Sequence, residues 1–186
     1  MKAGDKDYLE KSNSLRLTRR QLFAHYAIVP FLLITPIMTT FSLFQIYITK
    51  NYTGVRSAEE LMKTGYLWIL PALIIYFIQK RRLKFRVIKI SVTPENFKEA
   101  TILTGDKLNW EIQNITNNYI VAVRQGNFVG GSWGELITII RKDEKVLINS
   151  ICNPDNIISV ASWGWNRKNV ETFKICLESM INNNIK

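Results

Sequence analysis

The sequence predicts a two-helix transmembrane hairpin followed by a mainly β domain that ends in an α-helix. Two segments predict the hairpin, because residues 21–49 and 64–79 contain no Lys, Arg, Asp or Glu over 29 and 16 positions. After residue 85 the continuous apolarity gives way to short alternating or β-branched runs separated by turn residues, which is typical of strands. The expected parts are a basic N-terminal segment at 1–21, a hairpin at 22–80 with helices at 22–48 and 64–79, and a domain at 85–186.

The first uncharged segment is long enough to cross a bilayer, because a spanning helix needs about 20 mostly apolar residues. Pro30 and Pro36 are expected to kink it, and nearby Thr side chains can satisfy the backbone groups that these prolines free. The second segment is shorter, and Lys63 and Lys80 can reach outward from its ends. The alternatives are two buried helices of a soluble protein or a cleaved signal peptide. The length of the first segment argues against both.

Positive charge is concentrated beside these segments. The formal net charge of +10 divides into +3 for residues 1–20, +1 for 50–63, +6 for 80–89 and zero for 90–186. Because short flanks rich in Lys and Arg stay in the cytoplasm, we expect a multi-pass plasma (inner) membrane protein with both termini cytoplasmic. The basic cluster can also contact anionic headgroups, although the orientation signal alone explains it. Its members are Lys80, Arg81, Arg82, Lys84, Arg86 and Lys89.

Seven short runs predict a seven-stranded sandwich or barrel. They lie at residues 85–92, 97–103, 107–112, 119–125, 135–141, 145–151 and 157–162. Thr104-Gly105-Asp106 predicts a hairpin turn between the second and third strands. The Gly-rich residues 126–132 predict a long hairpin loop and not a phosphate cradle, because a strand and not a helix follows them.

An amphipathic helix is predicted to close the open side of these strands. Its apolar residues recur at intervals of three and four. They are Val170, Phe173, Cys176, Leu177, Met180 and Ile181. Either Asn166 or Asn169 is the expected N-cap.

The layout resembles that of small bacterial membrane proteins with a pleckstrin-homology-like (PH-like) domain, the YcxB-like and related bacterial PH-domain families. The resemblance rests on the strand that leads to Thr93–Phe97, on the Trp110 strand with Ile115, and on the helix Val170–Ile181. It implies a binding or scaffolding domain and not an enzyme.

The resemblance does not imply specific phosphoinositide binding. Lys89 and Lys98 fit the basic positions of lipid-binding relatives, but Glu99 and Ala100 stand where a further cation belongs. A phosphorylated headgroup requires several cations or bidentate arginines. Nucleic-acid binding is disfavoured because the domain carries no net positive charge.

We expect no catalytic residue, cofactor or metal, because no nucleophile–base pair, nucleotide motif or ligand cluster occurs in the sequence. His25, at the start of the first helix, is expected to lie among headgroups or to hydrogen-bond the neighbouring helix. Cys152 and Cys176 lack CxxC spacing and are expected to be buried free thiols.

Aromatic residues near glycines form the candidate partner-binding set. Exposed Trp marks binding surfaces, whereas the same side chains can fold back as lids, and the sequence leaves both readings open. The set is Phe128, Trp133, Trp163 and Trp165.

The leading hypothesis is a membrane-anchored PH-like binding or scaffold protein. It presents its cytoplasmic β domain to a protein or peptide partner, or to a second copy of itself, at the membrane surface. Two alternatives stay open at this point: an immunity-type protein that neutralises a membrane-active toxin, and an accessory subunit of a larger membrane complex.

Overall fold

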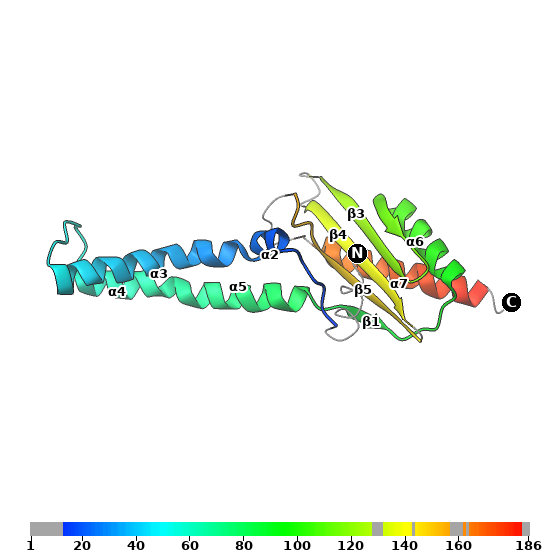
Figure 1. Ribbon diagram of the computed structural model, residues 1–186, viewed down its shortest axis with the longest axis horizontal. Helices are drawn as coiled ribbons and strands as arrows, with labels where there is room; N and C mark the ends of the chain where they lie inside the picture. The colour runs from blue at the N-terminus through cyan, green and yellow to red at the C-terminus, as the bar shows by residue number, and fades with distance from the viewer. Residues whose placement is uncertain (1–12, 128–131, 143, 157–161, 163, 184–186) are drawn as a thin grey trace. The chain divides into compact units, whose positions relative to one another are not determined.

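The computed structural model describes residues 13–127, 132–142, 144–156, 162 and 164–183. These residues form two compact units. One is the hairpin His25–Lys80, and the other combines the segment that ends at Ala24 with Arg81–Lys186 (Figure 1). We call them the hairpin and the β domain.

The first predicted helix is confirmed. It consists of α2 (Arg19–Tyr26), α3 (Ile28–Phe44) and the π-helical turn η1 (Gln45–Thr49). Pro36 lies inside α3, and the hydroxyl of Thr40 donates to its carbonyl oxygen at 2.9 Å. This is the side-chain compensation expected near a proline in an apolar helix.

The second helix is longer than predicted. It consists of α4 (Ala58–Gly65), η2 (Tyr66–Trp68) and α5 (Ile69–Arg82), so it begins at Ala58 and not at residue 64. A capping box causes the early start, because Ser57 accepts from the Glu60 N–H at 3.3 Å and Glu60 accepts from the Ser57 N–H at 3.0 Å. The uncharged segment therefore marked the apolar part of the helix and not its first turns.

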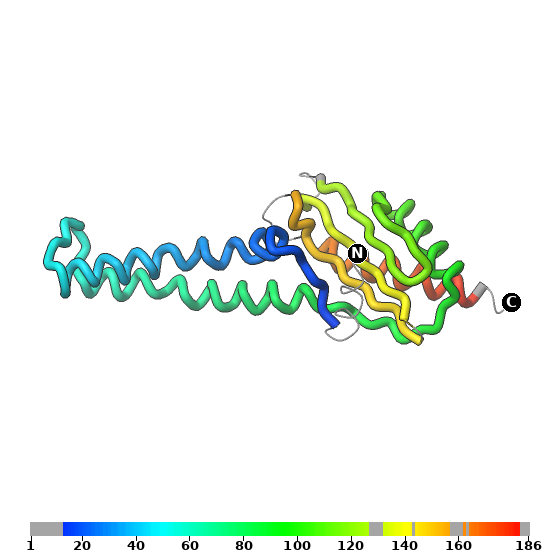
Figure 2. The backbone as a smooth tube through the Cα atoms, viewed as in Figure 1, coloured from blue at the N-terminus to red at the C-terminus, as the bar shows by residue number. Residues whose placement is uncertain are grey.

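The two helices of the hairpin lie side by side (Figure 2). Thr39 of α3 is buried. A Cβ atom added to Gly65 of α4 would overlap the Thr39 hydroxyl and would lie 2.6 Å from the Thr39 Cβ. The close approach therefore depends on the missing side chain of Gly65. At the other end, the Gln79 side chain donates to the His25 carbonyl at 2.8 Å, and the His25 Nε2 lies 3.1 Å from the Gln79 carbonyl. The expected hydrogen bond of His25 to the neighbouring helix is confirmed.

The hairpin directs large apolar side chains outward. Phe31, Ile37, Leu70 and Phe77 are 65%, 64%, 66% and 62% exposed. The segments Ile28–Thr49 and Ala58–Arg82 are both long and apolar enough to cross a membrane.

The predicted seven-stranded sandwich or barrel is wrong. The described residues contain one five-stranded antiparallel sheet in the order β1-β5-β4-β3-β2. Its strands are β1 (Arg86–Ile88), β2 (Trp110–Ile115), β3 (Tyr119–Asn127), β4 (Ser132–Lys142) and β5 (Lys145–Cys152). The β3–β4 hairpin is confirmed, with Asn127 opposite Ser132. The strand predicted at 157–162 falls almost wholly outside the described residues.

A helix replaces the second predicted strand, the Thr104-Gly105-Asp106 turn and the start of the third strand. It is α6 (Pro94–Leu108). The Thr93 hydroxyl caps it by accepting from the Asn96 N–H at 3.3 Å, and Asn109 ends it in a left-handed conformation with φ of 54°. Phe97, Ala100, Thr101, Thr104 and Leu108 are its buried face, at helical spacing.

The helices α6 and α7 (Trp165–Asn183) cover one face of the sheet (Figure 1). The predicted C-terminal helix is thereby confirmed. The main core lies between these layers and includes the fully buried Phe97, Ile137, Ile148 and Phe173. On the other face a smaller cluster joins Leu15 and Phe85 to Leu147 and Ile151.

The chain segments before and after the hairpin pair with each other in the β domain. Ser14 and Lys84 form an antiparallel bridge. The Leu15 N–H donates to the Leu83 carbonyl at 2.7 Å, and the Phe85 N–H donates to the Asn13 carbonyl at 3.1 Å. The side chain of Asn149 in β5 donates to the Lys84 carbonyl at 2.9 Å from the opposite side.

Replacing Thr93 by Ala removes the cap of α6 and should lower the free energy of unfolding by about 1 kcal/mol, whereas Thr93→Ser keeps an acceptor and most of the stability. Urea unfolding of the full chain in mild detergent measures both variants. Equal stability of Thr93→Ala and the unchanged protein would contradict the capped helix.

Gly65→Ala should loosen the hairpin by about 1–3 kcal/mol, the usual cost of overpacking. Dyes on the exposed positions 37 and 73 report helix separation by energy transfer during SDS titration in mixed micelles. In a Thr39→Gly background the same substitution should cost much less, because the three atoms nearest to the added Cβ all belong to the Thr39 side chain. An equal loss in both backgrounds would show that this contact does not set the helix spacing.

Candidate functional site

The six residues of the basic cluster fall on both sides of the unit boundary, which lies between Lys80 and Arg81. Lys80 ends the hairpin, and its ammonium group lies 5.9 Å from the centre of the Tyr76 ring. The other five belong to the β domain. Of these, Arg82 is half-buried, whereas Arg81, Lys84, Arg86 and Lys89 are exposed.

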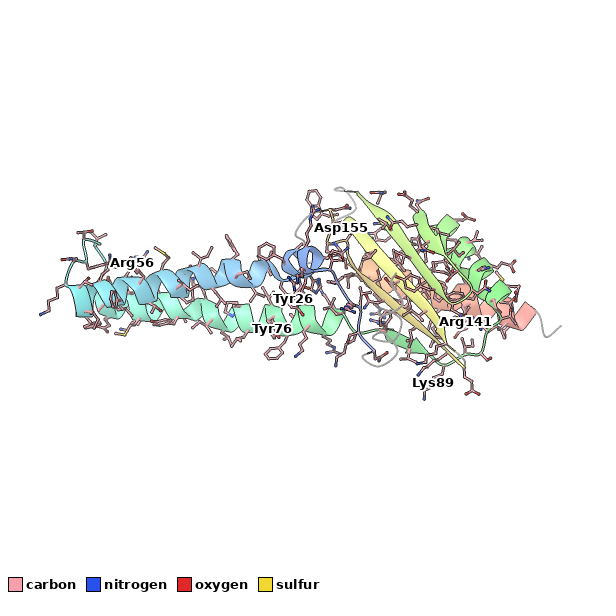
Figure 3. All side chains as sticks on the ribbon, in the orientation of Figure 1. Tyr26, Arg56, Tyr76, Lys89, Arg141 and Asp155 are labelled. Carbon is pink, nitrogen blue, oxygen red and sulfur yellow. The ribbon has the colours of Figure 1, made fainter. Side chains whose placement is uncertain are left out.

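An open cleft of about 400 Å³ lies between the β1 edge of the sheet and α7. Two members of the basic cluster, Arg86 and Lys89, line it. Figure 3 labels Lys89 at this border of the sheet. Its lining residues are Arg86, Val87, Ile88, Lys89 and Ile90 on one side and Val170, Glu171, Lys174 and Glu178 on the other. The basic residues are visible in the sequence but the cleft is not, because nothing in the sequence places α7 beside β1.

The charges of the cleft are unevenly compensated. Glu171 pairs with Arg167 at 2.6 Å, and Glu178 pairs with Lys174 at 3.7 Å, both along α7. Arg86 and Lys89 form no ion pair with any carboxylate of the described residues. Among the described residues, the unbalanced positive charge of the cleft therefore lies on its β1 side.

The candidate aromatic residues have different environments. Trp133 in β4 is 44% exposed. Trp165 at the start of α7 is half-buried, with the Arg124 guanidinium 3.4 Å and the Lys168 ammonium 4.4 Å from its ring centre. Phe128 and Trp163 lie outside the described residues.

A buried ion pair stands beneath Trp165. Arg124 of β3 donates to Glu135 of β4 at 2.8 Å, and their side chains are 8% and 0% exposed. The hydroxyl of Ser132 also donates to Glu135. Burial raises the pKa of Glu135, and the hydrogen bond from Ser132 and the charge of Arg124 partly offset that rise. Because Glu135 is fully enclosed, the pair is a structural clamp and not a reactive site.

This buried ion pair was not predicted from the sequence, although the sequence contains a signal for it. One face of β3 carries every second residue, namely Ile120, Ala122 and Arg124. Ile120 and Ala122 belong to the main core. A charged residue at an inward position requires an inward partner. The opposite strand supplies that partner, because Arg124 and Glu135 are in register.

A second buried polar network corrects the predicted N-cap of α7. Both Asn166 and Asn169 lie inside the helix, which begins at Trp165. Asn169 is fully buried, accepts from the Trp110 indole at 3.1 Å and donates to Ser150 at 3.0 Å. The asparagine therefore connects α7 to β2 and β5.

Cys152 and Cys176 are buried free thiols, as predicted. In the described part of the chain, no three His, Cys, Asp or Glu side chains come together in a way that could hold a metal ion.

Glu135 should make the β domain less stable as the pH rises, relative to Glu135→Gln. A folded-state pKa above the ordinary 4.5 means that the folded protein holds this proton more tightly than the unfolded chain. The resulting stabilisation is complete below the unfolded pKa and is lost as the pH rises through the folded pKa. Urea unfolding in mild detergent between acidic and neutral pH measures the difference between the two proteins.

The matched control is Glu111→Gln, which removes an exposed carboxylate on β2. The difference in free energy of unfolding between the unchanged protein and Glu111→Gln should not fall as the pH rises. A Glu135→Gln profile parallel to that of the unchanged protein would contradict the raised pKa.

Comparison of the whole chain with protein-family models, with curated proteins and with solved structures finds no match in any of the three. The resemblance to the bacterial PH-like families stays a prediction.

Proposed function

We propose that this chain is a membrane-anchored binding protein. The hairpin lies in the bilayer and holds the β domain at the cytoplasmic surface, where the domain binds a protein or peptide partner.

The outward apolar side chains of the hairpin are the observation that carries the proposal. Phe31 and Ile37 of α3 and Leu70 and Phe77 of α5 direct more than half of their surface outward. In water such a surface would favour association, whereas in lipid it is the favourable exterior. The polar side chains of the hairpin bond within it, as the pairs His25–Gln79 and Thr40–Tyr66 illustrate.

The orientation follows from the flanking bases. Residues 1–20 and 80–89 carry six Lys and Arg each, and the connector 50–63 carries three. The side with the greater number of bases stays in the cytoplasm. The β domain, which follows the second flank, is then cytoplasmic.

A binding role is supported by the cleft beside β1. It combines apolar surface from Val87 and Ile90 with the charges of Arg86 and Lys89, which no described carboxylate pairs, and it opens at the edge of a sheet. Binding sites commonly combine a mostly apolar lining with a few placed polar groups.

We expect the full chain to stay with membranes after alkaline carbonate extraction. A fluorescent protein fused after Lys186 should be active in the cytoplasm, and an alkaline phosphatase inserted at Gly54 should be active outside it. Release of the chain by carbonate, or an active phosphatase after Lys186, would contradict the anchor.

The binding half of the proposal is tested by affinity purification of the full chain from its own cells in mild detergent. A protein that co-elutes in fixed proportion supports it. A monomer that elutes alone contradicts it.

A further inference from the structure

Within the described part of the chain, the β1 edge of the sheet is covered over only part of its length. Asn13–Leu15 pairs with Leu83–Phe85 through two backbone hydrogen bonds. Asn13 is the first described residue of this pairing, and its φ of 49° is a left-handed conformation that a strand does not adopt. The edge beside Arg86–Ile88 follows directly and forms the mouth of the cleft.

Backbone groups at this mouth point outward. Lys84 directs its carbonyl toward Asn149 of β5, whereas Phe85 directs its N–H to the opposite side, toward Asn13. Because these directions alternate along a strand, the N–H and carbonyl of Val87 face the same outer side as those of Phe85. Val87 is 46% exposed, and its backbone forms no hydrogen bond on this side with any described residue.

The side chains around this edge specify an occupant. Ile88 turns toward the main core beside Val170, and Arg86 and Lys89 flank it. The acids of the opposite wall already pair with Arg167 and Lys174 on their own helix. An incoming strand therefore meets hydrogen-bonding groups that no described residue occupies, a short apolar floor and two cations that no described carboxylate pairs.

We propose that an extended acidic segment of a partner protein binds in this cleft as a sixth strand, antiparallel to β1. This inference rests on the proposed function, because it names the partner chemistry of that same domain. One acidic side chain lies opposite Lys89, an apolar one lies opposite Ile88, and a second acidic one lies opposite Arg86. Main-chain bonds to Val87 supply affinity, and the charges supply specificity.

The pairing of Asn13–Leu15 with Leu83–Phe85 is the precedent for this mode. It shows that the same edge accepts an antiparallel strand one step before the cleft. The proposed strand adds to the sheet along the same line.

The probe is a fluorescent five-residue peptide of sequence Thr-Glu-Val-Thr-Glu, titrated by anisotropy against the full chain in mild detergent. Its last residue lies opposite Arg86, so it does not overlap Asn13, which already lies opposite Phe85. Two altered peptides accompany it. In one, Lys replaces both Glu residues. In the other, the amide of the second Thr, which lies opposite Val87, is N-methylated, and this removes the donor to the Val87 carbonyl. Both should bind at least about tenfold more weakly, as expected for the loss of charge pairing or of main-chain hydrogen bonds.

Two substitutions at Val87 separate backbone pairing from side-chain contact. Val87→Pro removes the outward N–H but no bond to β5, so the sheet should remain intact. It should weaken peptide binding about tenfold, whereas Val87→Ala keeps the N–H and should weaken it little. The double variant Arg86→Glu/Lys89→Glu should bind the Lys peptide better than the Glu peptide. Lys98→Glu on α6 is the charge control and should change neither.

Circular dichroism and urea unfolding establish that each variant is folded. If Val87→Pro unfolds, the N-methylated peptide provides the same test on the unchanged protein. Equal binding of the methylated and unmethylated peptides, or no binding of the Glu peptide at low salt, would overturn the inference.

A lipid site is the competing outcome. A soluble anionic headgroup, glycerol phosphate, is titrated against the same variants in mild detergent, because the hairpin would insert into vesicles regardless of the cluster. If Arg86→Glu/Lys89→Glu abolishes binding of this headgroup and the Glu peptide does not compete, the cluster serves lipid and the peptide proposal is wrong.

The failure of this inference is distinguishable from failure of the proposed function. A partner that co-elutes equally with Val87→Pro and Val87→Ala would leave the binding role intact but move it away from the β1 edge. The inference predicts that this partner is lost from Val87→Pro alone.

Discussion

The antiparallel pairing of Asn13–Leu15 with Leu83–Phe85 is the contact on which the organisation of the β domain depends. It joins the residues just before the hairpin to those just after it, so the long insertion leaves and re-enters the domain at one place. Leu15 and Phe85 then complete the small core on the face of the sheet opposite the helices. The same pairing fixes the start of β1 and hence the border of the cleft. Without this pairing, Leu15 and Phe85 would not be held in the smaller core, and the start of β1 would not be fixed beside the cleft.

The predictions from sequence succeeded where one kind of pattern was long and unambiguous. The two uncharged segments and the periodic apolar face of α7 gave the right helices, because no strand accommodates such patterns. The region of α6 failed because its Thr and Ile residues favour strands locally, while Thr93 and Pro94 start a helix and the buried face recurs at three and four. Tertiary packing decided between the two.

The candidate site was foreseen in part. The exposed bases at Arg86 and Lys89 were identified, since charge is visible in sequence, but the opposing wall comes from α7, about 80 residues later. The Arg124–Glu135 pair was missed because each residue is ordinary in an exposed strand. Only the register of β3 and β4 shows that they meet, buried, beneath Trp165.

Trp165 has a consequence for how movement of α7 can be seen. Its ring lies between Arg124, on the sheet, and Lys168, on its own helix. Indole emission responds to nearby cations, and the wall of the cleft belongs to this same helix. A tilt of α7 that widens or narrows the cleft would change the distance to Arg124 while leaving that to Lys168 unchanged. The fluorescence emission of Trp165 would therefore report the position of the helix that borders the open edge.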